Sequence, residues 1–228
     1  MHFSEWEPVY LEIIKDLGIE RSSDEASARS LRMLTLNSNI ISEESLASVI
    51  AEDVIIAGGN ISGKDMTTLR TMLNDASDAK RTLISAGSAT DVLVTNDIIP
   101  DIAVTDLDGD AGMQKKASLN GTVTLVHAHG DNTELIMKHV KDLKGPIMMT
   151  TQSSPSGILC NFGGFTDGDR AVCMARHFGA KRITLIGFDF DTPAHKPGTD
   201  AEMKKRKLGW AKKVIFGMNP PDVSITMI

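Results

Sequence analysis

The chain has 228 residues, of which 41% are hydrophobic and 24% charged, a composition typical of folded globular proteins. Its 30 acidic residues exceed its 24 basic residues and only 4% of its residues are aromatic, which argues against nucleic acid as a partner. No apolar run approaches the roughly 18 residues of a membrane span, and the opening segment lacks the pattern of a signal peptide, so we expect a cytoplasmic protein without a membrane partner.

Residues 1–52 predict helices and no strand. Apolar residues recur at helical spacing from Trp6 to Leu17, and Gly18 follows as a stop signal. Serines near positions 22 and 42 can each cap a further helix. We therefore expect an N-terminal helical extension over 1–52, followed by a catalytic domain over 53–228. A homodimer would form if the extension buried its apolar stripe on a neighbouring copy.

The remainder of the chain alternates between strand and helix patterns. Short β-branched runs predict strands at Val54–Ala57, Thr82–Ser85, Ile102–Val104, Val123–Val126, Ile147–Met149, Ile183–Ile186 and Val223–Thr226. Helical patterns lie near Asp65–Ala79, Ser88–Val94, Asn132–Leu143, Asp169–Phe178 and Ala201–Phe216. This alternation predicts an α/β fold, an open and mostly parallel sheet flanked by helices. In such sheets ligands bind beyond the carboxyl ends of the strands.

Aspartates gather at these predicted strand ends and at one helix start. The set is Asp106, Asp108, Asp110, Asp131, Asp167, Asp169, Asp189 and Asp191. Like charges this close would raise one another's pKa unless a cation intervened. Oxygen ligands favour Mg²⁺ or Mn²⁺, and Mg²⁺ usually combines one or two carboxylates with nucleotide phosphates.

The segment TDLDGD gives the most specific indication of a metal site. Its D-x-D-x-D spacing also opens a calcium-binding EF-hand loop, but Ala111 and Ala117 stand where that loop needs Gly and Glu. The segment also follows a strand pattern instead of a helix. A polar turn with solvated aspartates is the alternative to a site in which Asp106 and Asp108 bind a metal.

HAHGDN follows the next predicted strand. It is one residue from an H-x-H-x-D-H zinc motif, with Asn132 in place of the last histidine, so a zinc hydrolase remains an alternative. We favour His127 and His129 as hydrogen-bond donors to a phosphate, Asp131 as a metal ligand and Asn132 as the cap of the following helix.

AGGNISGK follows the first predicted strand and resembles a phosphate-binding P-loop. Gly58, Gly59 and Lys64 would contact phosphate, but Asp65 occupies the place of the hydroxyl residue that holds Mg²⁺. A tight turn capped by Ser62 or Asp65 is an equal alternative.

GGFTDGDR and a later basic run supply further anion-binding candidates. Gly164 allows close backbone approach, Asp169 and Arg170 begin a helix, and Arg170 could fork onto a phosphate. Lys204 lies in a run of basic residues over 204–213, which is either a solvated face or a counter-charge for a polyphosphate.

Taken in order, these motifs resemble the archaeal 6-hydroxymethyl-7,8-dihydropterin pyrophosphokinase family and, more distantly, the thiamine pyrophosphokinases. PDIAVTDLDGD, VHAHGDN, GGFTDGDRAV and LIGFDF carry the likeness, which runs from about Asp53 to Trp210. Asp106 and Asp108 look like the paired aspartates of the thiamine enzymes' G-D-x-D-S motif, and Asp131 looks like their next metal-binding aspartate.

The resemblance implies transfer of diphosphate from ATP to the hydroxymethyl group of a reduced pterin, with release of AMP, in tetrahydromethanopterin or folate biosynthesis. It implies that Asp106, Asp108 and Asp131 hold Mg²⁺ on the ATP phosphates while Lys and Arg side chains clamp the transferred group. Asp110 or Asp169 would take the hydroxymethyl proton or orient the pterin, and His129 would assist. It also implies a fold like that of thiamine pyrophosphokinase.

Two other functions fit parts of the sequence. TDLD could be the D-x-D motif of a metal-dependent nucleotide-sugar glycosyltransferase, and the site could belong to a nucleotide-binding module without catalysis. Neither accounts for HAHGDN and GGFTDGDR, so the diphosphotransferase is our prediction.

Overall fold

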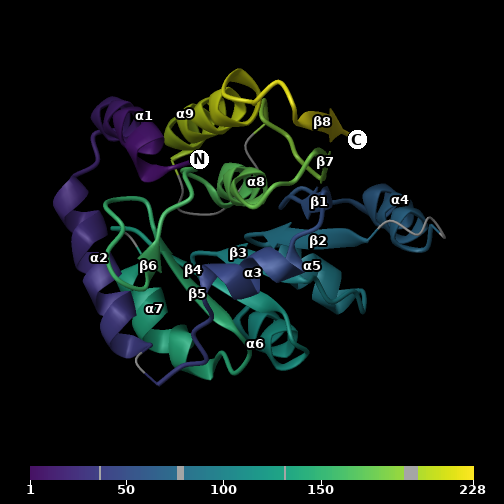
Figure 1. Cartoon of the computed structure of the whole chain (residues 1–228), viewed down its shortest axis with the longest axis horizontal. Coiled ribbons are helices and arrows are strands. Elements are labelled where there is room, and N and C mark those ends of the chain that lie inside the picture. The colour runs from purple at the N-terminus through teal and green to yellow at the C-terminus, as the bar shows by residue number, and fades with distance from the viewer. Residues whose placement is uncertain (36, 76–79, 131, 193–199) are drawn as a thin grey trace.

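The computed structural model describes every residue except 36, 76–79, 131 and 193–199. Its strands form one eight-stranded sheet in the order β6-β5-β4-β3-β2-β1-β7-β8, and the strand pairings are parallel (Figure 1). The strands are β1 (Asp53–Ala57), β2 (Arg81–Ala86), β3 (Ile102–Thr105), β4 (Val123–Ala128), β5 (Ile147–Thr151), β6 (Leu159–Cys160), β7 (Arg182–Ile186) and β8 (Ser224–Met227). The predicted α/β fold with an open parallel sheet is confirmed. Two-residue β6 was not predicted because it is too short to show a strand period.

The helices follow the predicted alternation with one addition. They are α1 (Phe3–Leu17), α2 (Arg21–Leu34), α3 (Glu43–Val49), α4 (Gly63–Leu73), α5 (Ala89–Thr95), α6 (Ala111–Leu119), α7 (Thr133–His139), α8 (Asp167–His177) and α9 (Ala201–Lys212). The sequence did not predict α6 because its buried face consists of Gln114, Ala117 and Ser118, which form no apolar stripe. The predicted helix over 65–79 ends at Leu73, and residues 76–79 lie outside the described residues.

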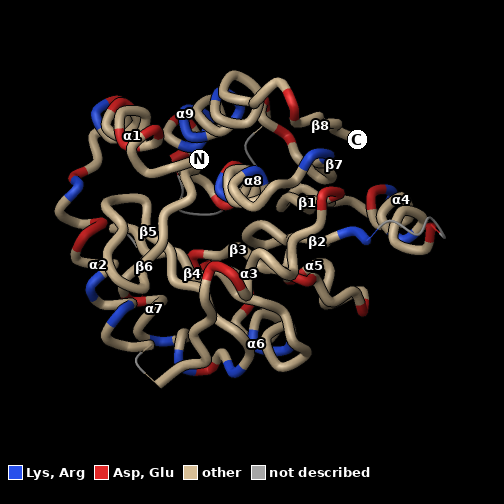
Figure 2. Tube along the Cα trace, viewed as in Figure 1, with Lys and Arg blue, Asp and Glu red and all other residues tan. Residues whose placement is uncertain are grey.

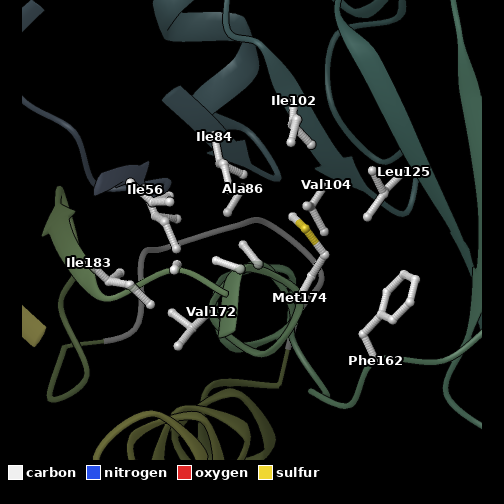
Figure 3. Packing of buried hydrophobic residues seen from close by; sticks show 14 of the residues in the cluster. Ile56, Ile84, Ala86, Ile102, Val104, Leu125, Phe162, Val172, Met174 and Ile183 are labelled. Atoms are coloured by element: carbon white, nitrogen blue, oxygen red, sulfur yellow. The ribbon is translucent and has the colours of Figure 1, made fainter. Parts of the chain in front are cut away.

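Helices cover both faces of the sheet because alternate strand residues point to opposite sides. On one face, Ile56 of β1 and Ile84 of β2 belong to the cluster that packs around Val172 of α8 (Figure 3). On the other face, Ile55 of β1 packs in a cluster with Leu69 of α4. Strands that are apolar on both faces are expected of a parallel sheet covered on both sides.

The N-terminal helices pack on this domain. Trp6 and Tyr10 of α1 are fully buried in a cluster with Phe165 and Cys173, which places α1 beside α8. Helix α2 contacts α7 and β5, and the residues after it form a bridge between Ile40 and Ile147 (Figure 1). The division of the chain at residues 52 and 53 stays a prediction.

The strand order creates a switch point beside β1. From β1 the chain builds strands outward to β6, and α8 then leads to β7 on the other side of β1. Connections that leave two neighbouring strands in opposite directions open a crevice between their carboxyl ends, where ligands bind in open α/β sheets. In the described part of the chain, no helix has the length and apolar character of a membrane span.

Candidate active site

A first hollow of about 450 Å³ lies at the switch point. Its lining includes Gly58 and Gly59 after β1, Gly187 and Phe188 after β7, Asp167 at the start of α8, and Lys204 of α9. The hollow therefore lies where the sheet topology predicts a ligand.

A second hollow of about 490 Å³ adjoins the first. Its lining includes Asp106 and Asp108 after β3, His129 after β4, Gln152 after β5, Arg170 of α8, Lys207 of α9, and Ser23 and Asp24 of α2. Asp108, Thr166, Asp167 and Lys204 line both hollows. Two ligands could thus meet at a shared rim formed by these four residues.

Close approach of two loops explains the glycines of the first hollow. The Gly58 N–H donates to the Ile186 carbonyl at 2.8 Å, and the Asn60 N–H donates to the Gly187 carbonyl at 3.0 Å. A Cβ on Gly58 would lie 2.7 Å from the Gly187 carbonyl oxygen, so no larger residue fits there without movement. The backbone of these loops lines the hollow directly, as a phosphate-binding loop requires.

A constrained turn presents the first two aspartates. Leu107, between Asp106 and Asp108, has a φ of 69°, and its N–H donates to the Thr105 hydroxyl at 2.9 Å. A left-handed conformation at a non-glycine residue costs about 1–3 kcal/mol. Burial of the Leu107 side chain against the core offsets this cost. The Asp108 N–H donates to Asp106 Oδ1 at 3.1 Å, which holds the two carboxyl groups on the same turn.

The aspartates of the site have opposite electrostatic surroundings. Burial alone would raise the pKa of Asp106, but its contact with His129, 3.3 Å from Nε2 to Oδ2, and its hydrogen bonds with Asp108 together outweigh that effect and lower the pKa to about 2. Burial raises the pKa of Asp167 well above its usual range, and the charges of Asp106 and Asp108 raise it further. Asp167 therefore lies in a buried position beside the negative charges of Asp106 and Asp108.

Arg170 is the main protein cation facing that charge. Its side chain is buried, and it donates to Asp167 Oδ1 at 2.8 Å and to the Phe165 carbonyl at 2.8 Å. Gly164, with a φ of +91°, lets the preceding loop pass so close to Arg170 that a Cβ there would overlap the arginine backbone. The glycine and the arginine of GGFTDGDR thus act together to place Asp167.

The donor set fits a hard divalent cation that arrives with other ligands. Asp106, Asp108 and Asp167 offer only oxygen, and the mutual repulsion that raises the pKa of Asp167 is what such a cation relieves. Within the described residues, no three His, Cys, Asp or Glu side chains form a complete metal site. Two carboxylates with nucleotide phosphates would complete a Mg²⁺ shell.

Comparisons with known proteins agree with this site. The family described as 6-hydroxymethylpterin diphosphokinase MptE-like matches residues 67–194. The protein named 6-hydroxymethyl-7,8-dihydropterin pyrophosphokinase of Methanothermobacter thermautotrophicus is 38% identical over 94% of this chain and 94% of its own length. Its namesake in Pyrococcus furiosus is 37% identical over 93% of this chain and 95% of its own length. The chain belongs to this diphosphokinase family.

Membership of the MptE-like family confirms the predicted resemblance and the prediction of a diphosphotransferase. A solved structure, the Maf glycosyltransferase of Magnetospirillum magneticum, matches 91% of this chain with a TM-score of 0.55 and 14% identity. The match covers 38% of that longer chain, and at this identity it supports the fold alone.

The structure brings eight of the predicted site residues of this MptE-like protein to the two hollows. They are Gly58, Gly59, Asp106, Asp108, His129, Asp169, Arg170 and Lys204. Asp110, Lys64, His127, Asn132 and Gly164 are outside the lining of both hollows, and Asp131 lies outside the described residues. The metal-binding and catalytic roles stay predictions.

Several of the residues outside the two hollows make contacts that stabilise the fold. Asp110 caps α6 by accepting from the Met113 N–H at 2.9 Å. Lys64 is exposed in the first turn of α4, where Ser62 and Asp65 form the capping box that the turn alternative requires. Buried His127 contacts the Thr150 hydroxyl at 3.0 Å.

Asn132 is the N-cap residue of α7, and its carbonyl accepts from the Ile136 N–H at 3.0 Å, but its side chain makes no capping hydrogen bond. Its amide nitrogen donates to the backbone carbonyls of Asp106 at 2.9 Å and His127 at 2.6 Å. Its amide oxygen accepts from the Ser27 hydroxyl at 3.1 Å and the His129 N–H at 3.0 Å. The predicted position of Asn132 at the cap of the helix is confirmed, but the side chain does not cap the helix because these four contacts occupy its amide.

Asp169 is fully buried and serves the backbone of its own loop. Oδ2 accepts from the Phe165 N–H at 2.7 Å, and Oδ1 accepts from the Thr166 N–H at 2.7 Å and from the Thr166 hydroxyl. Asp167, two residues earlier, is the one of the pair that lines both hollows. Sequence reasoning counted Asp167 among the clustered acids but gave it no role, because spacing alone does not tell which carboxyl group faces the loop.

The basic run over 204–213 has a divided role. Blue segments mark its Lys and Arg residues on α9 in Figure 2. Lys204 and Lys207 line hollows, whereas Arg206 pairs with Asp16 at 2.9 Å and Lys212 pairs with Asp191 at 3.4 Å. One side of the helix therefore faces the site and the other forms surface ion pairs.

Proposed function

We propose that this protein transfers the diphosphate group of Mg²⁺-bound ATP to 6-hydroxymethyl-7,8-dihydropterin, releasing AMP. The names of its relatives support the pterin substrate. The observation that carries the two-substrate reaction is the pair of adjoining hollows with a common rim at Asp108, Thr166, Asp167 and Lys204. The product would enter tetrahydromethanopterin or folate biosynthesis.

The reaction needs positioning and charge neutralisation more than covalent chemistry. The hydroxymethyl oxygen of the pterin attacks the β-phosphorus of ATP, and a new O–P bond forms. The bond from that phosphorus to the oxygen that bridges it to the α-phosphorus breaks, and AMP leaves with this oxygen and its electron pair. The proton of the hydroxymethyl group passes to an acceptor.

The residues that would bind the triphosphate follow β1, β3 and β4 in the chain or belong to α9. The backbone of Gly59 and the Lys204 ammonium line the first hollow, where they would contact phosphate oxygens. Asp106 and Asp108, with Asp131, would hold Mg²⁺ against the transferred phosphates. When bound, the ion would supply positive charge to phosphate oxygens that repel the attacking oxygen.

Asp167 is our candidate for the proton acceptor once a bound cation has offset the burial and repulsion that raise its pKa and has left the carboxyl group ionised. The oxygens of Asp110 and Asp169 already accept from backbone N–H groups, whereas Asp167 lines both hollows where the hydroxyl and the triphosphate would meet. The Arg170 guanidinium, 2.8 Å from Asp167 Oδ1, orients that carboxylate and adds a positive charge beside the transferred group.

The proposal is tested by mixing the protein with ATP, Mg²⁺ and 6-hydroxymethyl-7,8-dihydropterin. We expect AMP and pterin diphosphate in equal amounts, resolved by chromatography and ³¹P NMR, and no AMP when the pterin is omitted. Formation of ADP and pterin monophosphate would contradict diphosphate transfer.

The same assay separates the other candidate functions. A nucleotide-sugar glycosyltransferase would form no AMP and would release nucleoside diphosphate from a sugar nucleotide. A non-catalytic module would bind Mg²⁺ and ATP in calorimetry without forming product over several hours.

A further inference from the structure

We propose that the second hollow is the pterin-binding site and that the N-terminal helices α1 and α2 build its recognition wall. This inference rests on the proposed function and adds to it a binding site for each substrate. It also gives a role in substrate selection to the segment over 1–52, which the thiamine pyrophosphokinase likeness does not cover.

The two hollows differ in chemical character. The first is lined by closely packed glycine loops and by the rings of Phe188 and Phe190, which suits phosphates and a nucleobase. The residues that line only the second hollow include Asp24, Gln152 and Ser23. A small heterocycle with many polar ring atoms is the ligand that such a wall would select.

Asp24 and Gln152 form a buried polar pair on this wall. Asp24 has 1% and Gln152 3% of its surface exposed, and the Gln152 amide donates to Asp24 Oδ2 at 2.8 Å. The pyrimidine edge of a pterin carries N–H donors beside a carbonyl acceptor. A carboxylate next to a carboxamide presents the complementary groups.

Asp24 also retains capacity for a ligand. Its oxygens accept from the Tyr10 hydroxyl at 2.7 Å, the Gln152 amide and the Gly130 N–H at 2.7 Å. A carboxylate has about four acceptor positions, and the contacts from the described residues use three of them. A ring N–H or amino group of the pterin would take the fourth.

Helix α1 holds this wall rigidly in place. The Tyr10 hydroxyl that reaches Asp24 belongs to a fully buried side chain packed with Trp6 against the α8 region. Ser27 of α2 donates to Asn132, whose amide in turn holds the Asp106 carbonyl. The wall and the acidic turn are thus fixed relative to one another, which lowers the entropic cost of binding.

Positively charged side chains line the part of the second hollow where diphosphate transfer would take place. Arg170, Lys204 and Lys207 line it together with Asp106 and Asp108. A pterin seated against Asp24 and Gln152 would have these groups available to its hydroxymethyl substituent and to the diphosphate that this substituent receives. The opposite arrangement, with pterin between the phenylalanines and nucleotide beside α2, is the competing outcome of the test.

The test fills one hollow at a time. Ser23→Trp places an indole in the second hollow, and Ser22→Trp on the same helix is the matched control because Ser22 is exposed and lines neither hollow. Leu208→Trp fills the first hollow, because Leu208 lines the first hollow and not the second. For each variant, calorimetry measures the Kd of the reduced pterin in the presence of Mg²⁺ and α,β-methylene-ATP, and separately the Kd of that analogue.

We expect Ser23→Trp to raise the pterin Kd at least tenfold and to change the analogue Kd less than twofold. Leu208→Trp should do the reverse, and Ser22→Trp should change neither. Gln152→Ala, which removes the amide without adding bulk, should also weaken the pterin at least tenfold, and it decides the question if Ser23→Trp does not fold.

Failure of the inference and failure of the proposed function give different results. If the wild-type protein forms no pterin diphosphate and binds no pterin, the proposed function is wrong. If the wild-type protein is active but Ser23→Trp and Gln152→Ala bind pterin normally, or if Ser23→Trp weakens the nucleotide instead, the function stands and the assignment of the second hollow is overturned.

Discussion

Three aspartates that alternate along the turn after β3 have different surroundings. Asp106 and Asp108 line the second hollow, whereas Asp110 lies at the end of the turn and caps α6 through the Met113 N–H. Leu107, between the first two, has a left-handed backbone conformation. The repeated D-x-D spacing therefore contains both site residues and a helix cap.

At the residue scale, this difference predicts opposite effects of two similar substitutions. Asp108→Asn removes a negative charge at the shared rim, and we expect kcat at saturating ATP and Mg²⁺ to fall by about 10²-fold or more. Asp110→Asn should keep nearly full activity because asparagine also caps helices. Steady-state AMP formation measures both, and thermal unfolding checks that each variant folds. Normal activity in Asp108→Asn would remove that residue from the proposed metal site.

The buried histidine of HAHGDN predicts a pH dependence of stability. Burial lowers the pKa of His127 well below 6.5, and the positive charge of Arg170 adds to the effect. The unfolded chain then binds a proton that the native protein does not, so the free energy of unfolding falls as pH decreases below about 6.5, by at most about 1.4 kcal/mol per pH unit.

Urea unfolding between pH 7 and pH 5 measures this dependence. His127→Gln should show a shallower slope over that interval, whatever its stability at pH 7, because the variant lacks the proton-binding group. His177, whose pKa is also lowered mainly by burial, contributes in the same direction and stays in both proteins. Equal slopes in the two proteins would show that His127 is not the group responsible.

At the element scale, the start of α8 combines a helix-capping box with a residue of the candidate site. The capping box of Thr166 and Asp169 closes the glycine-rich loop onto the helix, and this closure places Asp167 at the rim of both hollows. The start of α4 has a similar box formed by Ser62 and Asp65, but its helix carries no residue of either hollow's lining. The two boxes therefore allow a matched comparison.

Substitutions that remove each capping box should both lower stability, but only the one at α8 should lower activity. Asp169→Ala leaves the buried Phe165 N–H and the half-buried Thr166 N–H without their acceptor, and we expect it to cost about 2 kcal/mol or more of stability and to reduce kcat. Asp65→Ala should cost about 0.3–1.5 kcal/mol and leave kcat unchanged. Chemical denaturation and the AMP assay measure the two effects. Full activity in a destabilised Asp169→Ala protein would mean that Asp167 does not depend on this loop.

At the scale of the whole molecule, parallel strands bring residues from distant parts of the chain to one edge of the sheet. The second hollow combines α2, the ends of β3, β4 and β5, and two helices from the C-terminal half. Within the described residues, however, no three side chains make a complete metal site. Since the proposed Mg²⁺ site combines protein carboxylates with ATP phosphates, we expect the protein and the nucleotide to bind Mg²⁺ jointly.

Metal removal tests this joint binding. EDTA should abolish product formation, and added Mg²⁺ should restore it. Mg²⁺ alone should scarcely change the melting temperature, whereas Mg²⁺ with α,β-methylene-ATP should raise it, because only ligands that bind the native state stabilise it. Full activity in EDTA would contradict the Mg²⁺ proposal, and a large shift with Mg²⁺ alone would mean that the protein holds the ion without nucleotide.

Local sequence patterns were sufficient to predict much of the fold. Strand and helix periods, with short buried runs such as Val54–Ala57, predicted the alternation and hence the parallel sheet, because these periods depend on neighbouring residues. Helix α6 escaped prediction because its buried side is polar. The order of motifs also identified the family, since several glycine and aspartate clusters recur together in its members.

Only the tertiary structure decided which of these residues face a ligand. Asp167 and Asp169 differ by two positions in one helical turn, yet one lines both hollows and the other binds its own loop. Asp24 has no motif around it and reaches the site because α2 packs beside the strand ends. Side-chain direction and strand order follow from long-range packing, which a single sequence does not display. The acid excess seen in composition is thus partly a site charge and partly caps and surface ion pairs.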